Sequence, residues 1–385
     1  MAIASELSKE RDQLFSDLFN NKIPQRVPVS MRLTYEFAAQ YVGYNLFEAQ
    51  WNTDKYEEIA DIVCQDFPND TLPVSTLRFP SLYTQLKANN WRMSSSGFLQ
   101  HPEVEGLKKE EYDYFIASPF DCIVEKVLPR LYENLDTDDP NQKAFALAKA
   151  FKTHSDEFGV MGTAKNRLIE KYGYSNCNLA AGSCEAPLDY VADQLRGFKN
   201  ILTDIRRLPD KVEAACEAIT PYMIKMGKFK APNPLGATFI PLHMAPYMRP
   251  KDFDRFYWPT FKRTVVGLKE MGQPSFIFCE QDWMRYLDYL YELPENTIML
   301  FEYGDPKKAK EMLGDKHIIS GFYPLTLFKT GTEEQCIDKA KELLDILAQG
   351  GKYIFNTDKS PVTLDSVNPD NVKAVLKYVS ENANY

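Results

Sequence analysis

The amino-acid sequence predicts a single (β/α)8 barrel of parallel strands, and three observations point to it. Four short apolar runs in the last third of the chain each end in polar residues, and amphipathic helix patterns lie between them. Apolar strands that alternate with helices are typical of a parallel sheet buried on both faces. No linker rich in Gly, Ser or Pro divides the 385 residues, a length that fits one large barrel domain, 1–385. The four runs are 275–280, 297–302, 317–321 and 352–358.

The N-terminal part of the chain predicts a helical lead and the first strand–helix units. Leucine and phenylalanine at three- and four-residue spacing give the first helix one apolar face. A long polar stretch follows, and we expect it to be an insertion that closes over a site as a hairpin. The expected elements are a lead over 1–25 with a helix at 5–19, a strand at 26–32, a helix at 56–64, a strand at 71–75, the insertion at 91–113, and helices at 119–132 and 141–158.

The remaining elements continue the alternation of strands and helices. Two further strands end near polar residues, and Trp258 and Pro259 interrupt one of the helices. Thr332 and Gln335 form a capping-box pattern, which predicts a helix start, and the glycine pair at 350–351 ends that helix. The expected elements are strands at 178–183 and 237–243, and helices at 188–202, 212–226, 251–271 and 332–347.

Composition excludes several classes of protein. The net charge is -9 and no basic block occurs, so nucleic-acid binding has little support. Mean hydropathy is negative, and neither an apolar stretch near 18 residues nor an N-terminal apolar signal core is present, so we expect no membrane span and a cytoplasmic location. The seven cysteines contain no C-x-x-C pair and predict buried, reduced thiols.

Three polar residues stand at or near the ends of different predicted strands: His243, Glu280 and Glu302. The ends of different barrel strands converge on one pocket, so these side chains can meet despite their separation in sequence. One imidazole and two carboxylates suit either an open zinc site or proton transfer. Ion pairs at the barrel rim, and a core histidine with a backbone partner, are equally good readings of the same residues.

A second set of residues could bind a substrate. Arg32 follows the first strand and could hold a substrate oxygen or pair with a barrel acid. Aromatic residues could sandwich an aromatic ring, although such residues more often belong to the core. Alternation along the strand places Cys279 opposite Glu280, facing the helices. The predicted substrate-binding residues are Met31, Arg32, Tyr35, Trp283 and Tyr303.

Three segments carry a resemblance to a known family. Residues 28–32 (P-V-S-M-R) resemble the first strand of uroporphyrinogen decarboxylase, and 318–324 together with 331–335 resemble the end of a late strand and the helix start that follows it. The resemblance is strongest from Phe239 onward and implies a (β/α)8 barrel. The superfamily has two main chemistries, which are decarboxylation of a porphyrinogen and methyl transfer to or from a corrinoid protein, often with zinc.

Departures from the family pattern favour methyl transfer. The second arginine of the decarboxylase signature M-R-Q-A-G-R-Y is missing, because Glu36 stands at its position. Phe278 and Glu280 replace the H-x-C of the thiol-type zinc site, and segments 301–306 and 358–361 resemble the corrinoid-dependent O-demethylases. The resemblance therefore implies an enzyme that moves a methyl group from an aryl methyl ether, such as veratrol or vanillate, to cobalamin carried by a separate corrinoid protein, with zinc as a further candidate. The alternatives are a decarboxylase of a tetrapyrrole acid and a non-catalytic scaffold.

Overall fold

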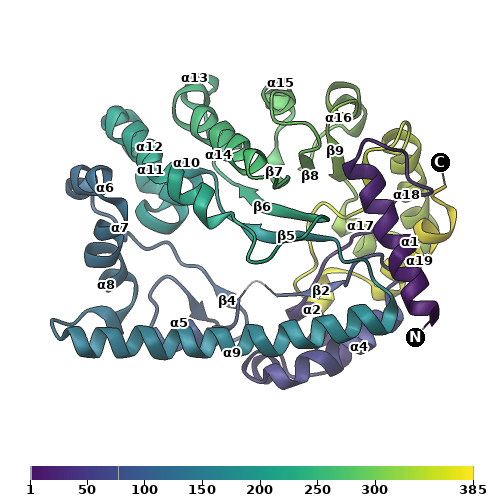
Figure 1. Ribbon diagram of the computed structural model, residues 1–385, viewed down its shortest axis with the longest axis horizontal. Coiled ribbons are helices and arrows are strands. Elements are labelled where there is room, and N and C mark those ends of the chain that lie inside the picture. Colours follow the sequence, from purple (N-terminus) through teal and green to yellow (C-terminus); the bar gives the residue numbers. More distant parts are fainter. Residues whose placement is uncertain (1, 77, 385) are drawn as a thin grey trace.

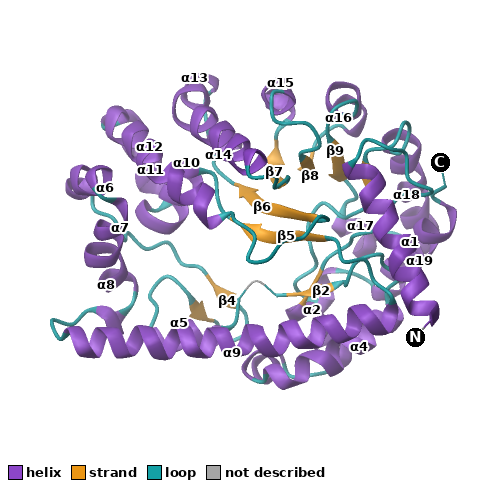
Figure 2. Cartoon of the chain, viewed as in Figure 1, coloured by secondary structure: helices purple, strands orange, loops and turns teal. Residues whose placement is uncertain are grey.

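A computed structural model describes residues 2–76 and 78–384, and its centre is a sheet of six parallel strands. The strands pair in chain order, each with the next, from β5 to β10, and β5 to β9 are labelled in Figure 2. They are β5 (Asn178–Ser183), β6 (Gly236–Leu242), β7 (Ser275–Asp282), β8 (Ile298–Tyr303), β9 (Ile318–Gly321) and β10 (Tyr353–Ile354). All six lie at strands expected from the sequence, although the ladder of the last is shorter than its apolar run.

The N-terminal segment extends the parallel strand pairing through a single bridge and one two-residue ladder. Val29 forms a parallel bridge with Phe355, directly after β10. Two short strands, β1 (Leu33–Thr34) and β2 (Val74–Ser75), then pair in parallel. Among the described residues no ladder joins β2 to β5, so the structure is a parallel α/β protein consistent with the expected barrel, and a closed ring of eight strands is not shown.

Helices pack around the sheet, and the long helix α9 runs along one side of the molecule (Figure 1). The helices before β5 are α1 (Ala2–Phe19), α2 (Tyr35–Val42), α3 (Leu46–Trp51), α4 (Tyr56–Asp66), α5 (Pro80–Leu86), α6 (Tyr112–Ala117), α7 (Pro119–Cys122), α8 (Leu128–Leu131) and α9 (Pro140–Tyr172). Those after β5 are α10 (Pro187–Tyr190), α11 (Phe198–Arg207), α12 (Pro209–Met226), α13 (Pro250–Asp252), α14 (Trp258–Glu270), α15 (Leu287–Tyr291), α16 (Pro306–Leu313), α17 (Leu325–Thr330), α18 (Glu333–Leu347) and α19 (Pro369–Asn382).

Several expected helices differ from those observed, and three of the differences have a local cause. The helix expected over 141–158 continues through Gly159 and Gly162 to the end of α9, because its buried face extends as far as Leu168. The helix expected over 188–202 breaks at Gly197, whose φ of 84° few other residues adopt. The helix over 250–270 is continuous but widens into a π-helical turn just before Pro259, which has no N–H to donate.

Side chains alternate between two apolar layers along each strand. One layer faces the helices and contains Cys279, which is fully buried. The other layer faces away from them and includes Phe276 and Phe278 of β7. Phe15 and Leu18 of α1 join this second layer, so α1 covers it. The period of two then places Glu280 on the same face as the two phenylalanines, at the C-terminal end of the strand.

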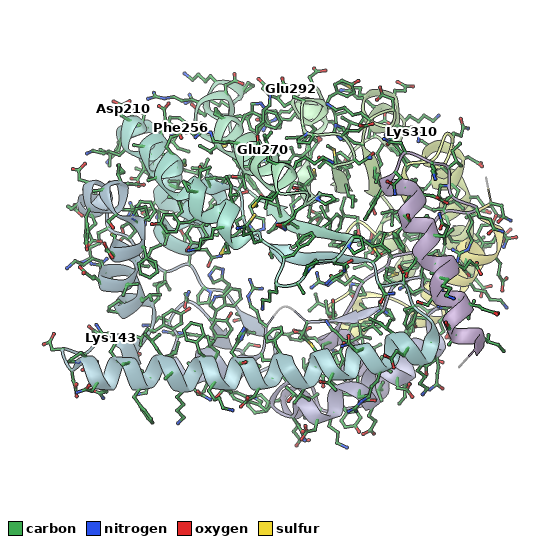
Figure 3. The ribbon with its side chains drawn as sticks, viewed as in Figure 1. Lys143, Asp210, Phe256, Glu270, Glu292 and Lys310 are labelled. Carbon is green, nitrogen blue, oxygen red and sulfur yellow. The ribbon has the colours of Figure 1, made fainter. Side chains whose placement is uncertain are left out.

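The insertion forms the expected hairpin, the cysteines are buried as expected, and charged side chains lie at the surface. Strands β3 (Arg92–Met93) and β4 (Leu99–Gln100) pair antiparallel. All seven cysteines are buried and free. Charged side chains such as Lys143, Asp210 and Glu292 lie at the periphery, away from the sheet (Figure 3). Within the described residues no helix has the length and apolar character needed to cross a membrane.

Asp70 connects the start of the chain to the sheet. Its carboxylate accepts two hydrogen bonds of 2.7 Å from Arg26 and one of 2.8 Å from the Val29 amide, and Arg11 of α1 lies 3.3 Å away. Its backbone carbonyl accepts from the Ser175 amide, just before β5. The side chain is only 3% exposed. Asp70 therefore connects α1 and the first strand through its carboxylate, and the lead into β5 through its backbone carbonyl.

We predict that Asp70→Asn lowers the free energy of unfolding by about 3 kcal/mol, because it leaves two arginines near the interior without their counter-charge. Urea denaturation followed by circular dichroism measures this loss. The control is Lys152→Ala, which removes one partner of an exposed pair with Asp156 and should change stability by less than about 0.5 kcal/mol. Equal effects of the two substitutions would contradict the role of Asp70.

Candidate active site

Polar side chains gather at the C-terminal edge of the parallel sheet. Glu185 follows β5, His243 follows β6, Glu280 lies near the end of β7 and Glu302 near the end of β8. The strands are parallel and in register, since Leu242 pairs with Cys279 and Cys279 with Phe301. The residues that follow these positions therefore reach the same level, as the sequence predicts for the three strand-end residues that it identified.

His243 lies between two carboxylates. Its Nδ1 is 2.5 Å from Asp193 Oδ2 and its Nε2 is 2.9 Å from Glu280 Oε1. Burial alone would lower the pKa of His243, but the hydrogen bonds and charges of the two carboxylates raise it to about 11. The ring is therefore an imidazolium at neutral pH that donates to both acids. About 40% of the side chain is exposed, so a molecule from solution can reach it.

Two more acids, Asp189 and Glu185, lie next to this histidine and its carboxylate partners. Asp189 is fully enclosed and accepts from the backbone amides of His243 and Met244 and from the Tyr257 hydroxyl, which fixes the turn after β6. Burial, and then the charge of Asp193, raise the pKa of Asp189 to about 7. Burial and the neighbouring aspartates also raise the pKa of Glu185 to about 7. Glu185 Oε1 accepts from Gln194, and its buried Oε2 has no hydrogen-bond partner among the described residues.

Glu302 belongs to a separate ion pair. Its carboxylate accepts 2.8 Å hydrogen bonds from Lys359 Nζ and from the Gln281 amide. Gln281 has a φ of 61° beside an irregularity in the β7–β8 ladder, which turns its amide toward Glu302. Burial would raise the pKa of Glu302, but Lys359 and the amide outweigh it and lower that pKa. Glu302 is thus an anion fixed at the rim.

The geometry does not fit the zinc site predicted for His243, Glu280 and Glu302. A histidine ligand needs a free lone pair, whereas both His243 nitrogens donate to carboxylates. Glu302 is held by Lys359 instead of joining the other two side chains. Within residues 2–76 and 78–384, no group of three His, Cys, Asp or Glu side chains is placed to hold a metal ion. The arrangement suits proton transfer better than metal binding.

The predicted substrate-binding residues lie in different places. Met31, Tyr35 and Trp283 are buried, with the Tyr35 hydroxyl donating to the Ala49 carbonyl and the Trp283 indole to the Glu280 carbonyl. These three side chains belong to the core, and Trp283 supports the backbone of Glu280 from behind. Tyr303, by contrast, is 67% exposed at the rim. Trp283 and Tyr303 therefore do not flank one aromatic ring, and Arg32 is half-buried just before β1.

The hairpin of the insertion reaches the site through a stack of rings. The rings of Trp91 and His101 lie 4.1 Å apart and nearly parallel, and the Arg78 guanidinium lies 4.1 Å from the centre of the Trp91 ring. Burial and Arg78 lower the pKa of His101, which also responds to the charges of Asp193 and His243. Residues near the start and end of the hairpin thus lie close to the acidic cluster around His243.

The sequence indicated some of these residues and missed others. Glu185 follows a strand that was correctly predicted, so the rule that identified Glu280 could have found it. Asp193 lies in a π-helical turn (Val191–Arg196), and no sequence pattern distinguishes it from a surface acid. Arg78 lies in a loop three residues after the expected strand at 71–75, and Lys165 lies on the long helix α9, away from any predicted strand end.

Fold and site together define an α/β protein with an acid–base cluster at the C-terminal edge of a parallel sheet. The family model for uroporphyrinogen decarboxylase (URO-D) matches residues 142–382, and the chain belongs to that family. Among solved structures, a methyltransferase from Methanosarcina mazei is similar in fold, with a TM-score of 0.62 and 15% sequence identity over 97% of this chain and 98% of that one. Comparison with curated proteins gives no match.

We predict that His243 keeps both ring protons at pH 8.5, while His317 stays neutral even at pH 5. Burial lowers the pKa of His317 to about 4, whereas the two carboxylates raise that of His243. Stabilisation by the protonated His243 should be complete below about 6.5 and lost as the pH rises through about 11. Nitrogen-15 chemical shifts of labelled histidines measure both states, with His243→Gln assigning the signal. A His243 signal that titrates near pH 6.5 would contradict the ion-pair arrangement.

Proposed function

We propose that this protein is a methyltransferase that takes the methyl group of an aryl methyl ether and passes it to the Co(I) corrinoid of a separate protein. The observation that carries the proposal is the imidazolium of His243, held between Asp193 and Glu280 at the edge of the sheet that solvent reaches. Likeness in fold to a methyltransferase supports it. We also propose that residues 1–385 form one barrel domain, with the first strand, β1 and β2 completing the ring.

The leaving group decides what the protein must supply. Breaking the bond between an aryl oxygen and a methyl group releases a phenolate, whose conjugate acid has a pKa of about 10. The His243 imidazolium, with a pKa of about 11, is matched to it within about one unit. The imidazolium can therefore serve as the acid for the departing oxygen. The corrinoid, when bound, supplies the nucleophile that accepts the methyl group.

The side chains of the chain itself orient and protonate the substrate. An ether oxygen that approaches His243 Nε2 competes with Glu280 Oε1 for the same proton. Asp193 keeps the ring in place through Nδ1. Its carboxylate also favours the protonated ring, so His243 takes up a proton again after it has given one to the substrate. Glu280 Oε2 has no hydrogen bond within the described residues, so it can accept one from a second substituent on the ring.

The rim beside this cluster is open to a second protein. Gln281, Asp282 and Tyr303 are exposed at the ends of β7 and β8, and Lys359 is half exposed beside them. A methyl group must meet the cobalt directly, so the corrinoid protein has to cover this edge of the sheet. We therefore propose the rim as the surface that receives the corrinoid domain.

A decarboxylase of a tetrapyrrole acid is the second candidate. It is favoured by three half-buried cations, Arg32, Arg78 and Lys165: the charge of Arg78 lowers the pKa of Arg32, and the charge of Arg32 lowers that of Lys165. An acid substrate with several carboxylates needs such cations. Incubation with uroporphyrinogen and chromatography of the products distinguishes this function from methyl transfer.

The first prediction from this proposal concerns the isolated chain, which should bind 1,2-dimethoxybenzene but release no phenol. Addition of a reduced corrinoid protein should start methyl transfer, because the chain provides the acid and the partner provides the nucleophile. Phenol release is measured by liquid chromatography and methyl transfer by the change in corrinoid absorbance. Phenol release by the chain alone would contradict the proposal.

The second prediction concerns the proton donor. His243→Gln and Glu280→Gln should each lower the rate of methyl transfer by about 10²-fold or more, the usual contribution of a positioned acid. The matched control is Glu292→Gln, which changes a carboxylate that pairs with Lys262 at the periphery, away from the sheet (Figure 3). Circular dichroism checks that each variant is folded. Near-normal rates in both site variants would reduce the pair to a structural contact.

A further inference from the structure

The outer side of helix α9 exposes two phenylalanine rings. The helix runs along one side of the molecule (Figure 1), and Phe145 and Phe151 are 73% and 64% exposed. Along its middle this side is uncharged apart from Lys152, which pairs with Asp156. A long exposed helix side with large apolar groups and few charges is typical of a surface that meets another protein. The other exposed residues along this middle are Ala144, Ala148, Ser155, Gly159, Thr163 and Asn166.

Two glycines lower the surface further along the same side. Gly159 and Gly162 lie inside α9, where glycine destabilises a helix relative to alanine. Among the described residues, no atom beyond the local helix backbone lies within 4 Å of the place that a Cβ would take at either glycine, so packing within the chain does not explain them. Gly159 borders a groove of about 550 Å³ that is lined also by Asp54, Glu57 and Thr163. The outer side of α9 is therefore raised in its N-terminal half and hollow in its C-terminal half.

The raised and hollow halves are complementary under a two-fold axis. Phe151 lies four residues before Ser155 and Gly159 lies four residues after it, so an antiparallel copy centred on Ser155 sets each Phe151 against the Gly159 of the other copy. Phe145, ten residues before Ser155, then reaches the groove, which extends to Arg167, twelve residues after Ser155. A two-fold interface needs one patch that is complementary to itself, and the outer side of α9 meets this condition.

Charges beside the phenylalanines favour a second copy as the occupant of the groove. Lys149 of α9 and Asp54 of the groove are exposed, and neither makes an ion pair within the described residues. Lys149 and Arg167 are 18 residues or five helical turns apart, so they share one flank of α9. The antiparallel arrangement thus brings Lys149 of each copy to the groove of the other. Glu57, the second acid of the groove, already pairs with Arg167, which leaves Asp54 for Lys149.

The exposed rings are large enough to contribute much of such an interface. A phenylalanine side chain buries about 200 Å², so covering Phe145 and Phe151 of both copies removes about 550 Å² from water. This is nearly half of the about 1,200 Å² of the smallest stable interfaces. Residues 144–166 extend for about 33 Å along the helix and supply the remainder. The size corresponds to a dimer of about micromolar affinity.

We propose that this protein forms a two-fold dimer in which the outer sides of two α9 helices pack antiparallel about Ser155. The groove beside Gly159 receives Phe145 of the second copy, and Gly159 lets the two helices approach where Phe151 packs. This inference goes beyond the proposed methyl transfer and does not depend on it.

Sedimentation equilibrium of the full chain tests the dimer. Between about 1 and 100 µM, the range around a micromolar affinity, the mass should rise from 44.3 kDa toward twice that value. The double variant Phe145→Glu/Phe151→Glu should weaken dimerisation at least 10-fold, because it places charges in the interface. The matched control is Phe120→Glu on α7, which is 60% exposed and should dimerise within about twofold of the wild type. A wild-type mass of 44.3 kDa throughout, or unchanged dimerisation of the double variant, would overturn the proposal.

Gly159→Leu separates loss of the dimer from loss of the fold. The space at this position is open, and leucine favours a helix, so circular dichroism of the dilute chain should show a melting temperature at least as high as that of the wild type. The added side chain occupies the place of Phe151 from the other copy, so dimerisation should weaken at least 10-fold. Unchanged dimerisation would overturn the pairing of these two residues.

Disulfide cross-linking tests the antiparallel arrangement. All seven native cysteines are buried, so a cysteine added on α9 is the exposed thiol. Ser155→Cys should form a cross-linked dimer on mild oxidation, because this residue lies at the two-fold axis. Asn166→Cys, 11 residues or about 16 Å along the helix from that axis, should stay unlinked. Cross-linking at both positions, or at neither, would overturn the proposal.

Discussion

The alternation of side chains along parallel strands in register is the constraint on which the rest of the structure depends. On β7, the positions occupied by Phe276 and Phe278 belong to an apolar layer that α1 covers, and the next position on the same face is Glu280. On β8, Ile298 and Leu300 lead in the same way to Glu302. Because neighbouring strands are aligned, the change from apolar to polar occurs at one level. A shift of one residue in any strand would turn its acid toward the helices.

This constraint explains what could be read from the sequence. The apolar runs, the parallel sheet and the strand-end positions of His243, Glu280 and Glu302 all follow from a period of two. What the sequence could not give is the pairing among these residues. Glu280 meets His243, whereas Glu302 meets Lys359, because an irregularity at the end of β7 separates the two strand ends. The pairing depends on the backbone conformation of Gln281, which no local pattern predicts.

Residues from helices and loops were missed for a different reason. Asp193 and Lys165 look like ordinary surface charges in sequence, and only the way their helices pack turns them inward. Trp283 and Tyr35 illustrate the converse. Both are aromatic residues near predicted strand ends, but the neighbouring helices cover them and backbone carbonyls satisfy their polar atoms. Exposure of a residue next to a strand end depends on the length and angle of the following helix, which alternation does not determine.

Charged side chains are distributed unevenly around the site. Glu185, Asp189, Asp193 and Glu280 surround one imidazolium at the β5–β7 side, so that side is acidic. Arg32 lies just before β1, Arg78 lies after β2 and Lys165 lies on α9; all three are half-buried, and among the described residues none forms an ion pair with a carboxylate. His101 of the insertion responds to both sides, since the charges of Arg78 and Asp193 shift its pKa in opposite directions.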